Sequence, residues 1–210
     1  MSGKVTIIDY GMGNLQSVIN AFMAVGAKVT VTDCPQDLYN ADRIVLPGVG
    51  AFGDGMKNLR DRGWIEVLKN EVLVKKKQFL GICLGMQLLA TTGTEHGRHT
   101  GFGWIPGTVE KFPDCRLPVP HIGWNDVYFT NKNSLFAGLG DAQVFYFVHS
   151  YVLRPEDPSV ISGKCTYGID FAASIESDNI FATQFHPEKS HKAGLAVLKN
   201  FLNIKRMAIC

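Results

Sequence analysis

The chain has 210 residues, which suits one α/β domain or two small ones. Hydrophobic residues make up 46% of it and charged residues 19%, so a sizeable core can be buried and a disordered chain is excluded. The formal net charge of +2 is too small to indicate a protein that binds nucleic acid or a membrane surface.

The sequence leads us to expect neither a targeting signal nor a metal site. No apolar run reaches the ~18 residues of a transmembrane helix, and the N-terminal run ends at Asp9, which is typical of a first strand rather than a signal peptide. The five cysteines are scattered without a C-x-x-C pair, so neither a disulfide framework nor a zinc site is indicated. His96 and His99 lie in a Gly- and Thr-rich segment that favours a solvated loop. We therefore expect a cytoplasmic protein with no metal and no cofactor.

The first half of the chain alternates strand and helix patterns. Strands are predicted over residues 5–10, 28–33, 43–48 and 78–83. Helices are predicted over residues 15–25, over 54–76 with a break near Gly63, and from residue 84 to about 91. The turn GMGN lacks the third glycine of a dinucleotide fingerprint, because Gln16 stands at that position. Strands separated by helices predict a parallel sheet covered on both faces.

The second half changes character. Short strand-like runs separated by turn residues occupy residues 104–112, 125–130, 143–153, 171–177 and 179–185. A last helix is predicted over residues 191–204. The predicted fold class is α/β: an open, mostly parallel twisted sheet flanked by helices, with an added mixed or antiparallel portion in the C-terminal half. Without linkers or repeats, one domain over residues 1–210 is expected.

One cysteine lies between two glycines in the run FLGICLGMQLL. Cys83 follows a predicted strand and precedes a predicted helix, with Gly81 and Gly85 two residues away on either side. This is the pattern of a nucleophile elbow, in which glycines relieve the crowding of a sharp strand-to-helix turn. The N–H groups of the following helix would favour the thiolate. On its own the pattern is equally compatible with an inert buried thiol.

A base for such a nucleophile is found in TQFHPEKS. Pro187 pushes His186 toward an extended conformation, and residues two apart in an extended stretch point to the same side. Glu188 can therefore hold the imidazole of His186 and stabilise its cationic form. Beside the cysteine elbow, this segment predicts a Cys83–His186–Glu188 triad.

An acyl-transfer site also needs donors for a tetrahedral oxyanion. The N–H of Leu84, directly after the nucleophile, is the natural first donor. The glycine-rich segment LPGVGAFGDG, residues 46–55, ends a neighbouring strand and can turn N–H groups inward.

These pieces resemble the class I, triad-type glutamine amidotransferases, and more closely their members that serve as glutaminase subunits of imidazole glycerol phosphate synthase. The resemblance runs from about Thr6 to Leu202. It is carried by IIDYGMGNLQSV, LPGVGAFGDGM, GICLGMQLL, PHIGWNDV, FYFVHSY and QFHPEKS.

The resemblance implies an activity and a partner. Members of this family hydrolyse L-glutamine to glutamate and ammonia through a glutamyl-thioester. The ammonia passes to a (βα)₈ cyclase subunit, which makes imidazole glycerol phosphate and an aminoimidazole carboxamide ribotide in histidine biosynthesis. A heterodimer with that subunit is expected, and glutaminase activity is expected to be low until the partner is liganded.

Site residues follow from the same resemblance, position by position. Cys83 corresponds to the nucleophile, His186 to the general base and acid, and Glu188 to the residue that orients it. The oxyanion donors would be the N–H groups of Val49 and Leu84. The residues implied in substrate binding are Gly50, Gln87, Glu95, Ser150 and Tyr151. Those implied at the partner interface are Asn14, Trp124, Tyr146 and Lys189, although Trp124 and Tyr146 could instead be core aromatics.

Three alternatives stay open at this point. A paralogous glutaminase could supply ammonia for surface-polysaccharide amino sugars. A cysteine peptidase or chaperone-like relative would share the sheet and elbow but would need no His-Pro-Glu segment. A non-catalytic binding subunit would be expected to have lost part of the triad.

Overall fold

The computed structural model describes residues 3–114, 117–131 and 134–204, so Cys115 and Cys210 lie outside the described residues. The helices and helical turns are α1 (Leu15–Ala24), η1 (Pro35–Asn40), α2 (Phe52–Asp61), α3 (Trp64–Leu68), η2 (Lys69–Val74), α4 (Leu84–Gln87), η3 (Pro158–Val160), η4 (Pro187–Lys189) and α5 (His191–Asn203). The strands are β1 (Lys4–Ile8), β2 (Lys28–Thr32), β3 (Arg43–Gly48), β4 (Gln78–Cys83), β5 (Ala90–Gly93), β6 (His99–Thr100), β7 (Ile105–Lys111), β8 (His121–Phe129), β9 (Ala142–His149), β10 (Tyr151–Pro155), β11 (Ile161–Tyr167), β12 (Ile169–Ser177) and β13 (Ile180–Thr183).

A nine-stranded sheet in the order β2-β1-β3-β4-β13-β12-β11-β8-β9 forms the centre of the described structure. The pairings from β2 to β13 are parallel, and those from β13 to β9 are antiparallel. The predicted α/β class with an antiparallel portion in the C-terminal half is confirmed, and that portion supplies half of the sheet.

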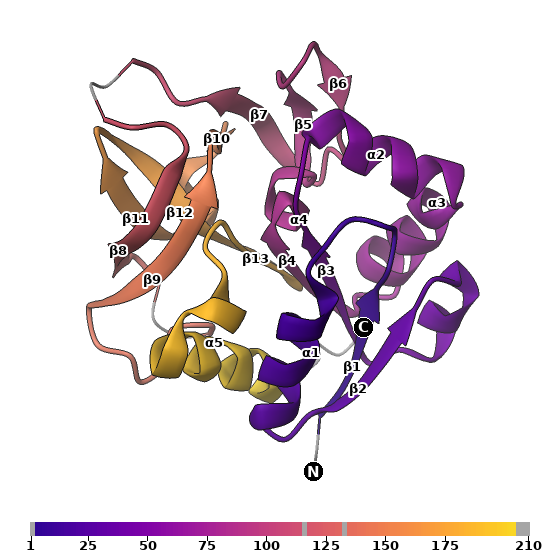
Figure 1. The fold of residues 1–210 in the computed structure, drawn as a ribbon. Helices are drawn as coiled ribbons and strands as arrows, with labels where there is room; N and C mark the ends of the chain where they lie inside the picture. The colour runs from indigo at the N-terminus through magenta and orange to yellow at the C-terminus, as the bar shows by residue number, and fades with distance from the viewer. Residues whose placement is uncertain (1–2, 115–116, 132–133, 205–210) are drawn as a thin grey trace.

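Helices cover both faces of the parallel strands. Successive side chains of each strand point to opposite faces, so each face has its own apolar core. Ile7 and Val45 face one core, which α1 and α5 close with Phe22 and Phe201. Ile8, Ile44 and Leu46 belong to the other core, together with the apolar residues of α2 and α3. Figure 1 shows α1 and α5 side by side on one side of the sheet and α2 and α3 on the other.

The position of β13 in the sheet brings together segments from the two halves of the sequence. This strand comes from the C-terminal half but pairs in parallel with β4, with Thr183 opposite Ile82. Parallel neighbours have their carboxyl ends at the same edge of a sheet, which is where sites collect in open α/β folds. Cys83 and the segment from Gln184 to Glu188 are thereby brought to the same edge.

The run QVFYFVHSYVL is not one strand. It breaks at Ser150 into β9, which ends the large sheet, and β10, which pairs with β7 in a second sheet of order β10-β7-β5-β6. The β-branched and aromatic composition of this run predicts extended backbone. The point at which the chain leaves one sheet and joins the other depends on the strands that pair with each part.

Other local predictions differ from the structure. The helix expected after Cys83 ends at Gln87, and the chain then forms β5, which pairs in parallel with β7. The long helical pattern does break at Gly63, which has a φ of +76°, but its last part is the π-type turn η2. The strands β5, β6 and β11 and the turn η1 were not predicted. Among the described residues no helix has the length and apolar character to cross a membrane.

Candidate active site

Cys83 stands on a strained turn between β4 and α4. Its φ of +56° and ψ of −108° are unusual for a residue with a side chain, and such strain concentrates at functional sites. A Cβ on Gly85 would lie 1.9 Å from the carbonyl oxygen of Leu46, and one on Gly81 would lie 2.6 Å from the carbonyl oxygen of Gly85. Both glycines are required by backbone atoms that close around the turn, as the elbow pattern predicted.

His186 and Glu188 lie at the same edge, directly after β13. The two form a buried ion pair in which Nδ1 of His186 is 2.7 Å from Oε1 of Glu188. The extended backbone of His186, with φ −96° and ψ 95°, and the turn η4 place both side chains on one side. The Oγ of Ser190 donates a hydrogen bond of 2.6 Å to the carbonyl oxygen of His186 and fixes this turn further.

The other ring nitrogen of His186 faces the thiol. Burial lowers the pKa of His186, but hydrogen bonding and charge from Cys83 and Glu188 outweigh it and raise the pKa to about 10. Nε2 is buried and has no hydrogen-bond partner among the described side chains at ordinary distances. The contact to Cys83 is therefore long or poorly aligned, a common state of catalytic pairs before substrate binds.

A cleft of about 440 Å³ opens beside the sulfur of Cys83. It contains the predicted oxyanion residues Val49 and Leu84. The residues predicted for substrate binding line it as well: Gly50, Gln87, Glu95, Ser150 and Tyr151. Five further residues of the wall were not predicted from sequence: Ala51, His96, Pro120, Val148 and His149. The volume falls in the range of small-molecule sites.

The two predicted oxyanion donors flank the nucleophile. Leu84 begins α4, so its N–H has no partner within the helix. Gly48 lies opposite Cys83 in the pairing of β3 with β4, which places the Gly48–Val49 peptide beside the turn. Under it lies Tyr10, whose buried hydroxyl would be 2.3 Å from a Cβ on Gly48 and has no hydrogen-bond partner among the described residues.

Glu95 and Tyr151 both line the cleft. The carboxylate of Glu95 accepts a hydrogen bond of 2.9 Å from the backbone N–H of Phe52, at the start of α2. Burial and the charge of Glu95 raise the pKa of Tyr151. The loop that carries Glu95 is thus tied to α2 while its carboxylate remains at the edge of the cleft.

A buried histidine pair includes His149 from the wall of the cleft. Nδ1 of His121 is 3.0 Å from Nε2 of His149, and Nδ1 of His149 is 2.9 Å from the carbonyl oxygen of Tyr151. Since a carbonyl only accepts, His149 must donate from Nδ1, and His121 must then donate to Nε2. Burial lowers the pKa of His121 to about 4 and that of His149 to about 3, so both rings are neutral at neutral pH.

Gln184 is a polar residue beside the nucleophile that was not predicted from the sequence. It is fully buried, and its Nε2 donates to Sγ of Cys83 at 3.7 Å. Its Oε1 accepts from Nε2 of Gln87 at 3.0 Å. Gln184 does stand in the TQFHPEKS segment that predicted His186 and Glu188, directly after β13. That its side chain points toward Cys83 could not be predicted, because this depends on the pairing of β13 with β4.

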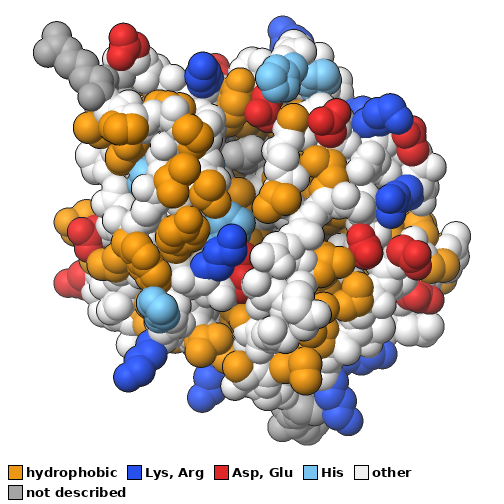
Figure 2. Space-filling model, in the orientation of Figure 1, with side chains coloured by type: hydrophobic (Ala, Val, Ile, Leu, Met, Phe, Trp, Pro, Cys, Tyr) orange, Lys and Arg blue, Asp and Glu red, His pale blue; other side chains and the backbone are white. Residues whose placement is uncertain are grey.

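Of the residues predicted to contact a partner, Trp124, Tyr146 and Lys189 lie together. Trp124 is 46% exposed, which excludes its reading as a core aromatic, and its ring lies 5.8 Å from that of Tyr146 and 4.8 Å from that of His191. Nζ of Lys189 lies 5.8 Å from the ring centre of Tyr146. Asn14 precedes α1 and is exposed. Figure 2 shows hydrophobic side chains gathered left of centre, over the side of the molecule that β8 and β9 form.

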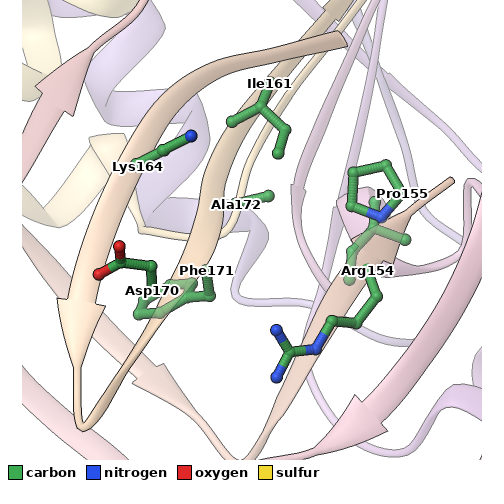
Figure 3. Close-up of a pocket in the computed structure, with 8 residues that line it drawn as sticks. Arg154, Pro155, Ile161, Lys164, Asp170, Phe171 and Ala172 are labelled. Carbon is green, nitrogen blue, oxygen red and sulfur yellow. The ribbon is translucent and has the colours of Figure 1, made fainter. Parts of the chain in front are cut away.

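A second hollow of about 210 Å³ lies between β10 and the hairpin of β11 and β12 (Figure 3). Arg154, Lys164 and Asp170 line its rim, and Phe171 and Ala172 lie between them. None of the predicted site residues lines it.

A thiol beside a histidine–glutamate pair, at the carboxyl ends of adjacent parallel strands, is an arrangement suited to acyl transfer from an amide. The profile of the family described as "Glutamine amidotransferase class-I" matches residues 6–204. The chain therefore belongs to the class-I glutamine amidotransferases, as its motifs predicted.

Similarity to curated proteins shows to which group within this family the chain belongs. The chain is 49% identical over 208 residues to the imidazole glycerol phosphate synthase subunit HisH of Geobacter sulfurreducens, covering 96% of this chain and 99% of that one. It is also 49% identical to the HisH subunit of Aquifex aeolicus, over 94% of this chain and 95% of that one. Within the amidotransferases, it belongs to the HisH subunits of imidazole glycerol phosphate synthase.

Solved structures agree on the fold. PurLQS from Thermotoga maritima superposes with a TM-score of 0.77 at 19% identity, over 97% of this chain and 99% of that one. A crystal structure titled as a glutamine amidotransferase gives a TM-score of 0.75 at 16% identity, over 95% and 99%.

Proposed function

We propose that this chain is the glutaminase subunit of an imidazole glycerol phosphate synthase, and that residues 1–210 act as one amidotransferase domain. It hydrolyses L-glutamine and delivers ammonia to a (βα)₈ cyclase subunit that makes imidazole glycerol phosphate and aminoimidazole carboxamide ribotide for histidine biosynthesis. The observation that carries this proposal is the buried His186–Glu188 pair, 2.7 Å apart, next to Cys83 in a cleft.

The first half of the reaction forms a thioester. The Cys83 thiolate attacks the side-chain carbonyl carbon of glutamine, and a C–S bond forms. The N–H groups of Leu84 and Val49 stabilise the oxyanion. His186, cationic beside the thiolate, gives its Nε2 proton to the leaving nitrogen, so the C–N bond breaks and ammonia departs. The raised pKa of His186 supports this role, because the ring holds its proton until the leaving group needs it.

The second half releases glutamate. Neutral His186 takes a proton from water, whose oxygen attacks the thioester carbonyl. The oxyanion forms again, and its collapse breaks the C–S bond and returns the thiolate beside cationic His186. The new carboxyl group loses its proton to solvent. Glu188 keeps Nδ1 of His186 in place throughout, so Nε2 is always the nitrogen that exchanges protons.

The cleft supports recognition of an α-amino acid. Gln87 donates both amide hydrogens, at 3.0 Å to the carbonyl oxygen of Tyr151 and at 3.0 Å to Oε1 of Gln184. Its Oε1 is the atom that remains for a ligand, and as an acceptor it suits an ammonium group. The carboxylate of Glu95 suits the same group, while the backbone near Gly50, Ser150 and Tyr151 would bind the α-carboxylate.

An exposed aromatic side supports a protein partner. The proposed interface consists of Asn14, Trp124, Tyr146 and Lys189. Aromatic residues and a cation in contact with each other, rimmed by exposed Ile122 and Val144, are typical of the centre of an interface.

Replacing the nucleophile tests the chemistry. Cys83→Ala should remove glutamine hydrolysis, measured as glutamate formed with and without the cyclase subunit and its nucleotide ligand, while binding of the cyclase persists. Cys34→Ala, which removes an exposed thiol outside the cleft, is the matched control. Ammonia release by Cys83→Ala in the liganded complex would show that the mechanism is wrong.

The pathway needs a separate test. The gene, together with the cyclase gene of the same organism, should restore growth of a histidine auxotroph that lacks both subunits. A Trp124→Ala variant should weaken cyclase binding without changing the fold. Failure of the wild-type pair to restore growth, with an active Cys83, would favour the amino-sugar paralogue.

A further inference from the structure

Gln184 is a fully buried amide whose polar atoms all point to particular partners. Its backbone N–H donates to the carbonyl oxygen of Ala173 at 2.8 Å. Its side chain accepts from Gln87 through Oε1 and donates toward the sulfur of Cys83 through Nε2. A buried amide without such partners would be costly, so this direction is strongly favoured.

The direction of the amide follows from the groups behind it. The carbonyl oxygen of Tyr151 only accepts hydrogen bonds, so Gln87 must turn its Nε2 toward it. The second hydrogen of that nitrogen then points to Gln184, which must present its oxygen. The remaining end of Gln184 is its NH₂ group, and this faces Cys83. The carbonyl of Tyr151 is itself held by His149.

We propose that Gln184 is a positioning residue for the nucleophile, holding the Cys83 thiolate through a hydrogen bond from its amide. The inference rests on the proposed role of Cys83. An amide donor favours the charged sulfur over the neutral thiol, as any hydrogen bond to the charged form does. It does not give up a proton, so it leaves the exchange between Cys83 and His186 undisturbed.

The same bond helps the last step of the reaction. A thioester sulfur is a weak acceptor, whereas a thiolate is a strong one. The contact from Gln184 therefore strengthens as the C–S bond breaks, which favours departure of the thiolate and hydrolysis of the intermediate.

The pH dependence of Cys83 alkylation tests this role without glutamine. Iodoacetamide is added to the full chain at a series of pH values, and the Cys83-containing peptide is quantified by mass spectrometry, so other cysteines do not contribute. In Gln184→Met, which keeps the length of the side chain but not the donor, we expect the apparent pKa of the Cys83–His186 pair to rise by about one pH unit.

Two further variants test the effect of added negative charge on the apparent pKa and provide a matched control. Gln184→Glu should raise the apparent pKa further, because a carboxylate adds negative charge beside the thiolate. Thr183→Val is the matched control: Thr183 is buried next to Gln184, but its hydroxyl donates to the carbonyl oxygen of Phe185, away from Cys83. Its profile should coincide with the wild type.

Gln87→Met provides an independent route, because it leaves Gln184 in place and removes the group that orients it, and the substrate contact of Gln87 plays no part in an assay without glutamine. It should raise the apparent pKa by less than Gln184→Met, and the double variant should match Gln184→Met alone. A wild-type profile in folded Gln184→Met, or in Gln87→Met should Gln184→Met fail to fold, overturns the role of Gln184. The role of Cys83 is judged separately, by the loss of hydrolysis in Cys83→Ala.

Discussion

At the scale of single residues, one carboxylate helps to keep the ring beside the nucleophile charged. Burial lowers the pKa of His186, and hydrogen bonding and charge from Cys83 and Glu188 together raise it. In Glu188→Gln we expect the pKa of His186 to fall, as seen in an NMR titration of its ring, and kcat of the cyclase complex to fall roughly 10²- to 10⁴-fold, since an oriented carboxylate is worth about this much in such triads.

Glu66→Gln, on the exposed side of α3, is a suitable control and should leave both quantities unchanged. An unaltered pKa of His186 in Glu188→Gln would contradict this account. The three candidates for the proposed triad could be chosen from sequence because each stands in a local pattern. Gln184 could not, because its amide is oriented by Gln87, which is far away in the chain.

At the scale of elements, the turn between β4 and α4 depends on the absence of side chains at two positions. Gly85→Ala would place its Cβ against the backbone of β3, which has no freedom to move, so we expect a loss of about 3 kcal/mol or more in the free energy of unfolding. Urea denaturation followed by fluorescence or circular dichroism measures it.

Gly26→Ala measures the loss of stability from backbone strain alone, without the steric crowding expected at Gly85. Gly26 has a φ of +85° but no atom within 4 Å of an added Cβ, so only the left-handed backbone should cost, at about 1–2 kcal/mol. Equal losses in the two variants would mean that the crowding at Gly85 is relieved by small shifts. The glycine pattern could be read in advance, but the early end of α4 could not, since β5 forms only where β7 lies alongside.

At the scale of the whole molecule, the buried neutral pair of His121 and His149 makes the fold sensitive to acid. Burial lowers the pKa of His121 to about 4, against 6.5 for a free histidine, so between these values the unfolded chain binds a proton that the native chain does not. Stability therefore falls as the pH falls. His121→Asn, which keeps a donor near His149, should reduce the slope by up to about 1.4 kcal/mol per pH unit.

Urea denaturation between about pH 4.5 and pH 6 measures that slope, with wild type and variant compared at each pH. A His191→Asn variant serves as control, because this histidine lies on the exposed aromatic side. Identical slopes for wild type and His121→Asn would show that the pair takes up protons in the native state.

The two-part sheet could be predicted from the sequence because the first half alternates strand and helix while the second half has closely spaced strand runs. The position of β13 among the parallel strands could not be predicted. It depends on β12 and β13 turning back toward β4, which is a matter of packing over the whole sheet rather than of local composition.

That position has a consequence for how the protein is made. The nucleophile and its base lie about a hundred residues apart, and they meet only when β13 pairs with β4. A chain still emerging from the ribosome, folded as far as β12, carries the thiol without the histidine. Synthesis from the N-terminus thus keeps the thiol without its base until the final elements are in place, so free ammonia is not released by unfinished copies.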